Sequence, residues 1–319
     1  MKIALVGGGG RLGKSLVKFL REFNSEFSFN IVGRRKYEKL DQEIKENLLS
    51  KDSYFNEKDL DHAIEKSDKI FIFIPSSGLN YEIKDEFKYI KDKIIPKTSF
   101  ICERAFSKAK HIILISSGAV YNANTFQNDL TIGPNELSEL KKIDERNGYA
   151  YVKLMQEKIL RDIYKKEENY TILRLFSISD YFFSKPVFAI EDIISQANNS
   201  IEKPLIISNA EIYRSFISTY DISKIIYKIL RSSIYGIFNL SGKEVISITD
   251  LAKLAIKESG IKRDILFKKD INQLTKITRN NYYGDPTKSF QLYNKDSFQN
   301  LDFQIRMLTA RVKKLNENK

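Results

Sequence analysis

A short apolar run, Ile3–Val6, leads directly into a glycine-rich segment. Together with Val6 this segment reads Val6-Gly7-Gly8-Gly9-Gly10-Arg11-Leu12-Gly13-Lys14-Ser15. Glycine accepts positive φ angles and lets the backbone come close to a bound phosphate. A helix that begins after such a loop presents N–H groups and the positive end of its dipole to an anion. The segment therefore predicts a strand, a phosphate-binding turn and a helix, in that order.

Consecutive glycines leave the spacing of this motif open. Gly8, Gly10 and Gly13 fit GxGxxG, whereas Gly7, Gly10 and Gly13 fit GxxGxxG. A plain glycine turn without a ligand is the alternative, but the position directly after a first strand favours a dinucleotide site. The residues expected to contact the cofactor here are Gly7, Gly10, Arg11, Leu12 and Gly13.

The end of the second predicted strand, Phe29–Val32, indicates which dinucleotide is preferred. An acidic residue there would hold the ribose 2′-hydroxyl of NAD, but the chain continues with Gly33-Arg34-Arg35-Lys36. Guanidinium groups bind phosphate through paired hydrogen bonds, so Arg34 and Arg35 favour the 2′-phosphate of NADP(H), and Arg11 can join them. NAD(H) stays open as the cofactor, because a solvated basic turn would have the same sequence.

Short apolar runs alternate with longer amphipathic stretches through the first half of the chain, which is typical of a parallel sheet with helices on both faces. Strands buried on both faces are apolar throughout, as Ile70–Ile74 and Ile112–Ile115 are. We therefore predict an α/β fold with a Rossmann-type doubly wound parallel sheet. The expected strands are Ile3–Val6, Phe29–Val32, Lys69–Ile74, His111–Ser116 and Thr171–Leu175. The expected helices are Leu12–Phe23, Tyr37–Leu49, Leu60–Lys66, Ser99–Lys108 and Tyr149–Lys165.

The alternation loosens after about residue 177. We predict a dinucleotide-binding Rossmann domain over residues 1–177, which carries the catalytic residues. A smaller, mixed α/β substrate-binding region follows over residues 178–319, and elements of the two can interleave. The segments that indicate this second region are Pro204–Ile207, Phe216–Ile217, Asp221–Leu230, Ile237–Leu240 and Thr249–Glu258.

Composition narrows the class of protein. With 319 residues, 42% of them apolar, the chain can bury a full core, and its single cysteine, Cys102, favours a reducing compartment. No signal peptide and no apolar stretch long enough for a bilayer is visible, so we expect a cytoplasmic protein without membrane insertion. The net charge of +12 comes from scattered lysines, which disfavours a nucleic-acid partner. No set of metal ligands is predicted.

Tyr149 and Lys153 lie four residues apart, and so on one face of a predicted helix. A free tyrosine titrates near pH ~10 and is a poor acid or base at neutrality. A nearby lysine ammonium favours the phenolate and brings the pKa of the tyrosine toward the working pH. The pair therefore predicts a general acid and base, although YxxxK by itself also occurs by chance on many helices.

A serine at the end of a predicted strand strengthens this prediction. The run Ile115-Ser116-Ser117-Gly118-Ala119-Val120-Tyr121 ends a strand at the sheet edge where α/β proteins bind ligands. The Ser117 hydroxyl can hydrogen-bond a substrate oxygen there. A serine turn that only satisfies backbone groups is the alternative.

These motifs together resemble the NAD-dependent epimerase/dehydratase family of extended short-chain dehydrogenases over about residues 1–260. The resemblance implies a catalytic triad of Ser117, Tyr149 and Lys153, in which Lys153 also holds the nicotinamide ribose. It further implies a nucleotide-sugar substrate and a homodimer formed through a helix pair that includes the Tyr149 helix. Other segments in the family's order are Leu173–Phe176, Arg214–Ile217 with Asp221, and Phe238–Leu240.

The resemblance also implies residues that bind the substrate. Arg214 would contact the nucleotide diphosphate, and Arg279, from a looser match, would be a second contact. A structural ion pair between Arg214 and Asp221 is the alternative. Ser177 stands where the family has an asparagine, and Pro75-Ser76-Ser77-Gly78 replaces the family's usual pair of alanines, so the sugar itself is not identified.

The residues after Ser117 bear on the reaction. Dehydratases of the family have threonine followed by Asp-Glu, whereas Gly118 and Ala119 follow Ser117, which disfavours a dehydratase. Epimerases usually retain NAD, whereas the basic loop fits an NADPH that is consumed. We therefore expect an NADPH-dependent ketoreductase acting on a nucleotide-linked keto-deoxysugar, with Tyr149 as general acid. The alternatives are a nucleotide-sugar 4-epimerase with retained NAD and a non-catalytic NADP-binding regulator.

Overall fold

The computed structural model describes residues 1–40, 42–46, 48–68, 70–75, 86–108, 111–121, 148–165, 169–199, 203–207, 212–267 and 281–317. These residues form two compact units. The first takes in the chain up to residue 121, residues 148–175 and Ser223–Asn239, and the second takes in Phe176–Ile222 and the chain from Leu240 on. The division into domains after residue 177 stays a prediction.

The first unit is built on a seven-stranded sheet. Its strands are β1 (Lys2–Val6), β2 (Ser28–Gly33), β3 (Ser53–Asn56), β4 (Ile70–Phe73), β5 (His111–Ser117), β6 (Tyr170–Leu175) and β10 (Gly236–Leu240). Their order is β10-β6-β5-β4-β1-β2-β3, and β1 to β6 pair in parallel. The chain starts in the interior of the sheet and extends it in both directions, so the predicted doubly wound α/β fold is confirmed.

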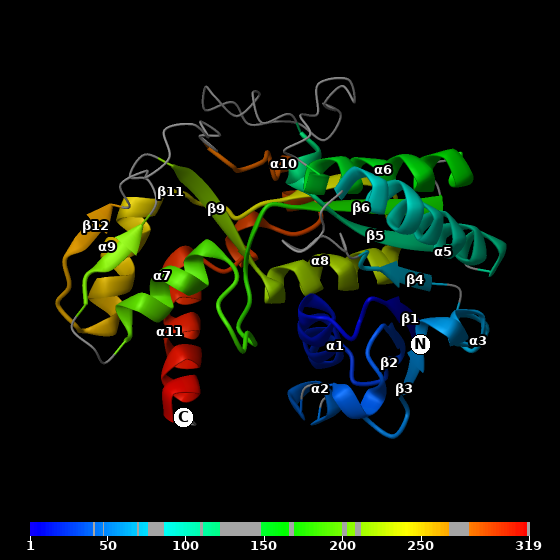
Figure 1. The fold of residues 1–319 in the computed structure, drawn as a ribbon, viewed down its shortest axis with the longest axis horizontal. Helices are drawn as coiled ribbons and strands as arrows, with labels where there is room; N and C mark the ends of the chain where they lie inside the picture. Colours follow the sequence, from blue (N-terminus) through cyan, green and yellow to red (C-terminus); the bar gives the residue numbers. More distant parts are fainter. Residues whose placement is uncertain are drawn as a thin grey trace. The chain divides into compact units, whose positions relative to one another are not determined.

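Helices lie on both sides of this sheet (Figure 1). They are α1 (Arg11–Phe23), α2 (Gln42–Glu46), α3 (Leu60–Glu65), α4 (Glu86–Tyr89), a π-helical segment (Ile90–Ile94), α5 (Ile95–Lys108), α6 (Gly148–Tyr164) and α8 (Thr219–Ser232). The 3₁₀ turns are Tyr37–Lys39, Glu57–Asp59 and Gly118–Val120. α5 and α6 pack against each other, and α6 also packs against β5. α1 contacts α8 through Phe23 and Tyr227, whose ring centroids are 5.6 Å apart.

The middle strands are apolar because both of their faces are covered. Every residue of β5 and of β6 is buried. Parallel strands end at a common edge of the sheet, so the residues that follow β1, β4 and β5 lie near one another. Val6 is in register with Phe73 on the neighbouring strand, and Phe73 with Leu114 on the next. This edge is where the predicted site residues gather.

The structure differs from the predicted elements at three places. The predicted helix Tyr37–Leu49 is instead the 3₁₀ turn followed by the short α2. The predicted helix Ser99–Lys108 begins earlier, at Ile95, after the π-helical segment. Pro96 has no N–H to donate, and an irregular turn before it accommodates the missing bond. The short edge strand β3 was not predicted, because its four residues are only half-buried and do not form an apolar run.

The second unit combines two small sheets with several helices. Its strands are β7 (Ser177–Ser179), β8 (Leu205–Ile207), β9 (Tyr213–Ser218), β11 (Val245–Ser247) and β12 (Ile265–Phe267). They form one sheet ordered β11-β9-β7 and a pair of β12 with β8. The helices are α7 (Ala189–Ala197), α9 (Ile248–Ser259), α10 (Thr287–Phe290) and α11 (Leu301–Glu317), with a 3₁₀ turn at Lys295–Ser297. In the part of the chain that the structure describes, no helix has the length and apolar character needed to cross a bilayer.

Candidate active site

The glycine loop between β1 and α1 leaves no room for side chains at two positions. Gly7 has a φ of 82°, and a Cβ there would lie 2.2 Å from the carbonyl oxygen of Ile74. A Cβ on Gly13 would lie 2.3 Å from the carbonyl oxygen of Gly8. The loop is therefore a bare backbone cradle, and its shape fits the pyrophosphate of a dinucleotide.

The start of α1 adds a favourable field for an anion. Gly10 is the N-cap residue and supplies no side-chain cap, and the first turn holds no acidic residue. Gly10 donates its N–H to the carbonyl oxygen of Gly7 at 3.0 Å, which closes the turn. Backbone N–H groups and the helix dipole at such a start favour a bound phosphate. Arg11 and Leu12, which begin this helix, are among the predicted cofactor residues.

A cleft of about 730 Å³ within the first unit opens beside this loop. Gly7, Gly10, Arg11 and Leu12 line it, so four of the five predicted loop residues face one cavity. Pro75, which follows β4, lines it as well. A cleft of this size and position, at the carboxyl ends of parallel strands, is typical of a cofactor site.

Arginines stand at the rim of the cleft, as the sequence predicts. Arg11, Arg34 and Arg35 all line it, and β2 ends at Gly33 rather than at an acidic residue. The Arg35 Nη2 donates to the carbonyl oxygen of Gly9 at 3.2 Å and so ties the turn after β2 to the glycine loop. A guanidinium held beside a phosphate-binding loop suits an anionic group of the cofactor.

Sequence reasoning missed the part of the cleft that β3 and α5 supply. The Tyr54 hydroxyl donates to the carbonyl oxygen of Arg35 at 3.0 Å and lies against Gly33, where a Cβ would be 2.1 Å from it. Lys97 reaches the cleft from α5 and pairs with Glu57 at 2.5 Å. A signal for this strand was present in the sequence. Two aromatic residues, Tyr54 and Phe55, favour a strand, and Asn56, which caps the following 3₁₀ turn, comes directly after them.

The three predicted triad residues lie together at the end of β5. Ser117 is buried, accepts the N–H of Ala119 on its Oγ at 3.2 Å, and shares a side-chain hydrogen bond with Tyr149. The Lys153 ammonium lies 5.9 Å from the centroid of the Tyr149 ring. The Lys153 Nζ donates to the carbonyl oxygen of Pro75 at 2.9 Å. Because Pro75 also lines the cleft, the triad adjoins the predicted cofactor site.

Burial sets the proton affinities of these groups. Loss of solvent lowers the pKa of Lys153 to about 8, although the charge of Glu157 opposes that change. Burial raises the pKa of Tyr149 and the hydrogen bond from Ser117 lowers it, with a net rise. The expected fall in the Tyr149 pKa is therefore not observed, because desolvation of the phenolate outweighs its favourable contacts.

Arg214 and Ser177 lie in the second unit, on neighbouring strands. Arg214 is on β9, where its Nη1 donates to the carbonyl oxygen of Tyr213 at 2.8 Å and its guanidinium lies 5.7 Å from the centroid of the Tyr282 ring. Ser177 is the first residue of β7, which pairs in parallel with β9. Their roles in substrate binding stay predictions.

Two further predictions for the substrate side concern Asp221, and Arg279 with the segment after Pro75. Asp221, the alternative partner of Arg214, accepts the Ser218 hydroxyl at 2.8 Å and the Gln299 N–H at 3.1 Å, which accounts for its burial. Arg279 and the segment Ser76-Ser77-Gly78 lie outside the described residues.

The model of the NAD dependent epimerase/dehydratase family matches residues 3–241, three quarters of the chain. The chain therefore belongs to this family, and the predictions of the family and of an enzyme are confirmed. No curated protein matches the chain significantly.

Solved structures similar to the whole chain include epimerases of UDP-sugars. UDP-glucuronic acid 4-epimerase from Bacillus cereus, in complex with UDP-glucuronic acid and NAD, has a TM-score of 0.77 at 21% identity and covers 99% of this chain and 100% of its own. UDP-N-acetylglucosamine 4-epimerase from Methanobrevibacter ruminantium M1, in complex with UDP-N-acetylmuramic acid, has a TM-score of 0.72 at 18% identity and covers 100% and 99%. At these identities the likeness shows a shared fold.

Proposed function

We propose that the chain is a nucleotide-sugar 4-epimerase that works with a bound nicotinamide dinucleotide. The observation that carries this proposal is the gathering of Ser117, Tyr149 and Lys153 beside the glycine-loop cleft. Membership of the epimerase/dehydratase family supports it. The fold shared with 4-epimerases over nearly the full length of both chains supports epimerisation over the ketoreductase expected from the sequence.

A nicotinamide dinucleotide bound in the cleft supplies the acceptor and donor of a hydride. The glycine loop and the start of α1 would hold its pyrophosphate, and Lys153 its nicotinamide ribose. Tyr149, as the tyrosinate, takes the proton of the sugar hydroxyl as the ketone forms, and returns it when the hydride comes back to the opposite face. Ser117 hydrogen-bonds the same oxygen while its charge changes. The Lys153 ammonium stabilises the Tyr149 tyrosinate before the proton is taken and after it is returned.

The ketoreductase remains the second candidate, and the arginines at the cleft rim favour it. Arg11, Arg34 and Arg35 line the cleft where a 2′-phosphate would bind, and no acid ends β2. A raised Tyr149 pKa also suits the proton donor of a reduction. This enzyme would consume one NADPH for each nucleotide-linked ketone that it reduces.

Two measurements on the purified protein separate the candidates. We expect mass spectrometry of the denatured protein to find retained NAD, and UDP-glucuronic acid or UDP-N-acetylglucosamine to be converted to an isomer of equal mass. Absorbance at the reduced-nicotinamide band should show no net consumption of cofactor. Stoichiometric oxidation of NADPH with a nucleotide-linked 4-keto-6-deoxysugar would assign the reductase instead.

The substrate side of the proposal rests on the second unit. There, Arg214 would bind the nucleotide diphosphate, and Ser177 would lie near the sugar. Arg214→Ala should raise KM for a UDP-sugar about tenfold or more, since a hydrogen bond to a charged group is worth about 1.5–3 kcal/mol. An unchanged KM would remove Arg214 from the site. We also propose, from the family, a homodimer, which sedimentation analysis would test.

A further inference from the structure

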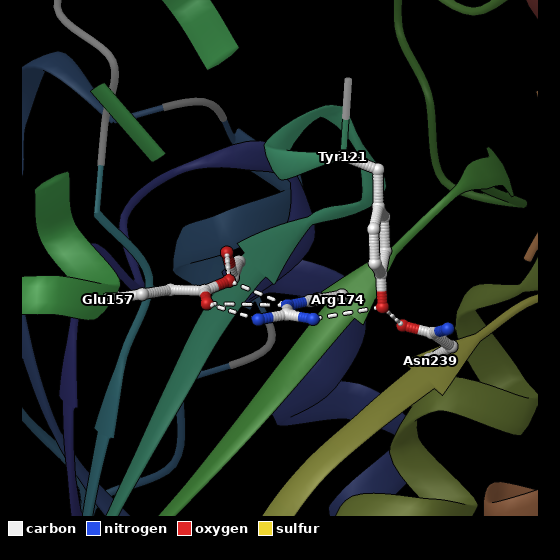
Figure 2. Close-up of polar contacts among 5 residues, drawn as sticks. Tyr121, Glu157, Arg174 and Asn239 are labelled. Atoms are coloured by element: carbon white, nitrogen blue, oxygen red, sulfur yellow. Dashed lines mark hydrogen bonds and ion pairs between the residues drawn. The ribbon is translucent and has the colours of Figure 1, made fainter. Parts of the chain in front are cut away.

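A buried carboxylate lies one helical turn beyond Lys153 and joins α6 to the sheet (Figure 2). Glu157 accepts hydrogen bonds from the Nε of Arg174 at 3.0 Å and from its Nη2 at 2.7 Å. The hydroxyl of Ser116 donates to the same carboxylate at 2.5 Å. Three elements, α6, β5 and β6, therefore meet at one side chain.

The network continues on the far side of the guanidinium. The Nη1 of Arg174 donates to the hydroxyl of Tyr121 at 2.9 Å, and this hydroxyl donates to the Oδ1 of Asn239 at 2.7 Å. Figure 2 shows the four side chains in a row across the ends of the strands. The Arg174 side chain is 0% exposed and that of Glu157 is 1% exposed. Every member belongs to the first unit.

Stability alone does not account for such a pair. Taking two charges out of water costs several kcal/mol for each ion, and their attraction often only offsets that cost. Apolar side chains of similar volume would stabilise the fold at least as well. A feature of this kind is more readily explained by what it holds in place, and two triad residues lie close to it along the chain, Lys153 one helical turn before Glu157 and Ser117 directly after Ser116.

The network reaches the triad along two covalent paths. On α6, Glu157 follows Lys153 by four residues, as Lys153 follows Tyr149, so the three side chains lie along one face of the helix. On β5, Ser116 immediately precedes Ser117. The carboxylate thus fixes α6 against the end of the strand that carries the triad serine. The hydrogen bond between Ser117 and Tyr149 also joins β5 to α6.

Glu157 also acts on Lys153 through its charge. Burial alone disfavours the ammonium of Lys153 and lowers its pKa, and the negative charge of Glu157 opposes this. Among the residues that the structure describes, Lys153 also contacts the ring of Tyr149 on the same helix and the carbonyl of Pro75 after β4. Arg174 on β6 pairs with Glu157.

We propose that Glu157, clamped by Arg174 and Ser116, is a positioning residue of the active site, which docks the Tyr149 helix on β5 and supplies the buried Lys153 ammonium with its counter-charge. This inference rests on the proposed function, because Lys153 has a chemical role only if the triad is catalytic. Glu157 touches no reacting atom and acts through Lys153 and through the position of α6.

The direct test is the titration of Lys153 in the full-length protein. Lysine labelled with ¹³C at Cε reports the charge of each amine by NMR, and Lys153→Arg identifies the resonance. In the wild type we expect a midpoint near pH 8, where burial and Glu157 place the pKa. Glu157→Gln removes the counter-charge and nearly preserves shape, so the midpoint should move down by about one pH unit. An unchanged midpoint would overturn the proposal.

The same helix offers a matched control. Asp162 is paired with Lys158 at 2.8 Å, and its side chain is 63% exposed. Asp162→Asn removes the same charge from α6, but solvent screens that site, so the Lys153 midpoint should stay in place. A shift as large as that of Glu157→Gln would mean that any negative charge on α6 suffices, and would also overturn the proposal.

Glu157→Gln leaves Arg174 as an unpaired buried charge and can prevent folding. The double variant Glu157→Gln with Arg174→Gln has no such charge and tests the same point. It should fold, and its Lys153 midpoint should fall by a smaller amount, because a positive charge is removed together with the negative one. A wild-type midpoint in that variant would refute the role of Glu157.

Activity gives the second readout. The alkaline limb of kcat on a UDP-sugar should move to lower pH in Glu157→Gln, because Lys153 loses its proton earlier, whereas KM should change little. An alkaline limb that stays in place although the Lys153 midpoint falls would refute the functional role. Failure of the proposed function shows differently, as turnover that survives Tyr149→Phe, and the NMR titration is independent of it.

Discussion

The site in the first unit has two ends, the glycine loop first and the proposed triad second, and they are built in different ways. At the glycine loop, the contacts join residues close in sequence, as in the N–H of Gly10 on the carbonyl of Gly7, and backbone atoms make the surface. At the triad, Lys153 reaches the carbonyl of Pro75 across 78 residues, and Ser116 reaches Glu157 across 41. At the first end a short stretch of chain forms the turn, and the ends of β2 and β4 contact it. The second depends on how helices dock on the sheet.

This difference separates binding from chemistry. A backbone cradle recognises phosphate without any side chain that titrates near neutral pH. The proposed triad would work through side-chain protons whose affinities depend on burial. Substitutions at one end should therefore leave the other end intact, and four predictions test whether they do.

The largest effect is expected at Tyr149. Tyr149→Phe removes the proton donor and acceptor and should lower turnover by about 10²–10⁴-fold, the usual contribution of general acid–base catalysis. Affinity for the nicotinamide cofactor, measured by fluorescence titration, should stay within about twofold. Tyr151→Phe, two residues along the same helix and off this face, is the control and should keep full activity. Loss of cofactor binding in Tyr149→Phe would show that the two ends are not independent.

The converse substitution is Gly7→Ala. A Cβ at this position must accept a φ of 82° and meets the Ile74 carbonyl oxygen at 2.2 Å, so the free energy of unfolding should fall by about 3 kcal/mol. Gly260→Ala is the matched control, because Gly260 has a similar φ of 74° and nothing within 4 Å, and it should cost only about 1 kcal/mol. Urea denaturation measures both. Equal losses would mean that the close approach at Gly7 is unimportant.

A smaller effect is expected at Arg34, one of the arginines that line the cleft. Arg34→Ala should weaken NADPH binding about tenfold and leave NADH binding nearly unchanged, because only NADPH carries the 2′-phosphate. Lys36→Ala, also exposed and in the same turn but absent from the cleft lining, should change neither affinity. If the wild-type protein bound NADH as tightly as NADPH, the arginines that line the cleft would not select the cofactor.

The smallest effect is expected at the surface of α6. Asp162→Asn breaks an exposed pair between residues four apart, so the free energy of unfolding should change by less than about 0.5 kcal/mol. Arg174→Met, which breaks the buried pair between Arg174 on β6 and Glu157 on α6, should cost about 3–5 kcal/mol. Thermal unfolding compares the two. Similar costs would show that burial does not distinguish them.

Much of this site could be predicted from the sequence because its motifs are contained in short segments. The glycine loop, the arginine turn after β2 and the four-residue spacing of Tyr149 and Lys153 are each contained in a few consecutive residues. The strands β1, β2, β4, β5 and β6 were predicted with small errors at their ends, since strands buried on both faces are apolar runs. The edge strand β3 lacks that signature, and Tyr54 was missed with it.

What the sequence by itself determined is the set of local chemical groups: a glycine cradle before a helix, a basic turn without an acid, and a serine, a tyrosine and a lysine in motif order. Only the tertiary structure decided which of these groups meet, that Glu157 and Arg174 form a buried pair beside Lys153, and that the pKa of Tyr149 rises. The physical reason is that burial and ionic contacts between distant segments depend on how α6 packs on β5 and β6. The spacing of residues within one segment does not determine that packing.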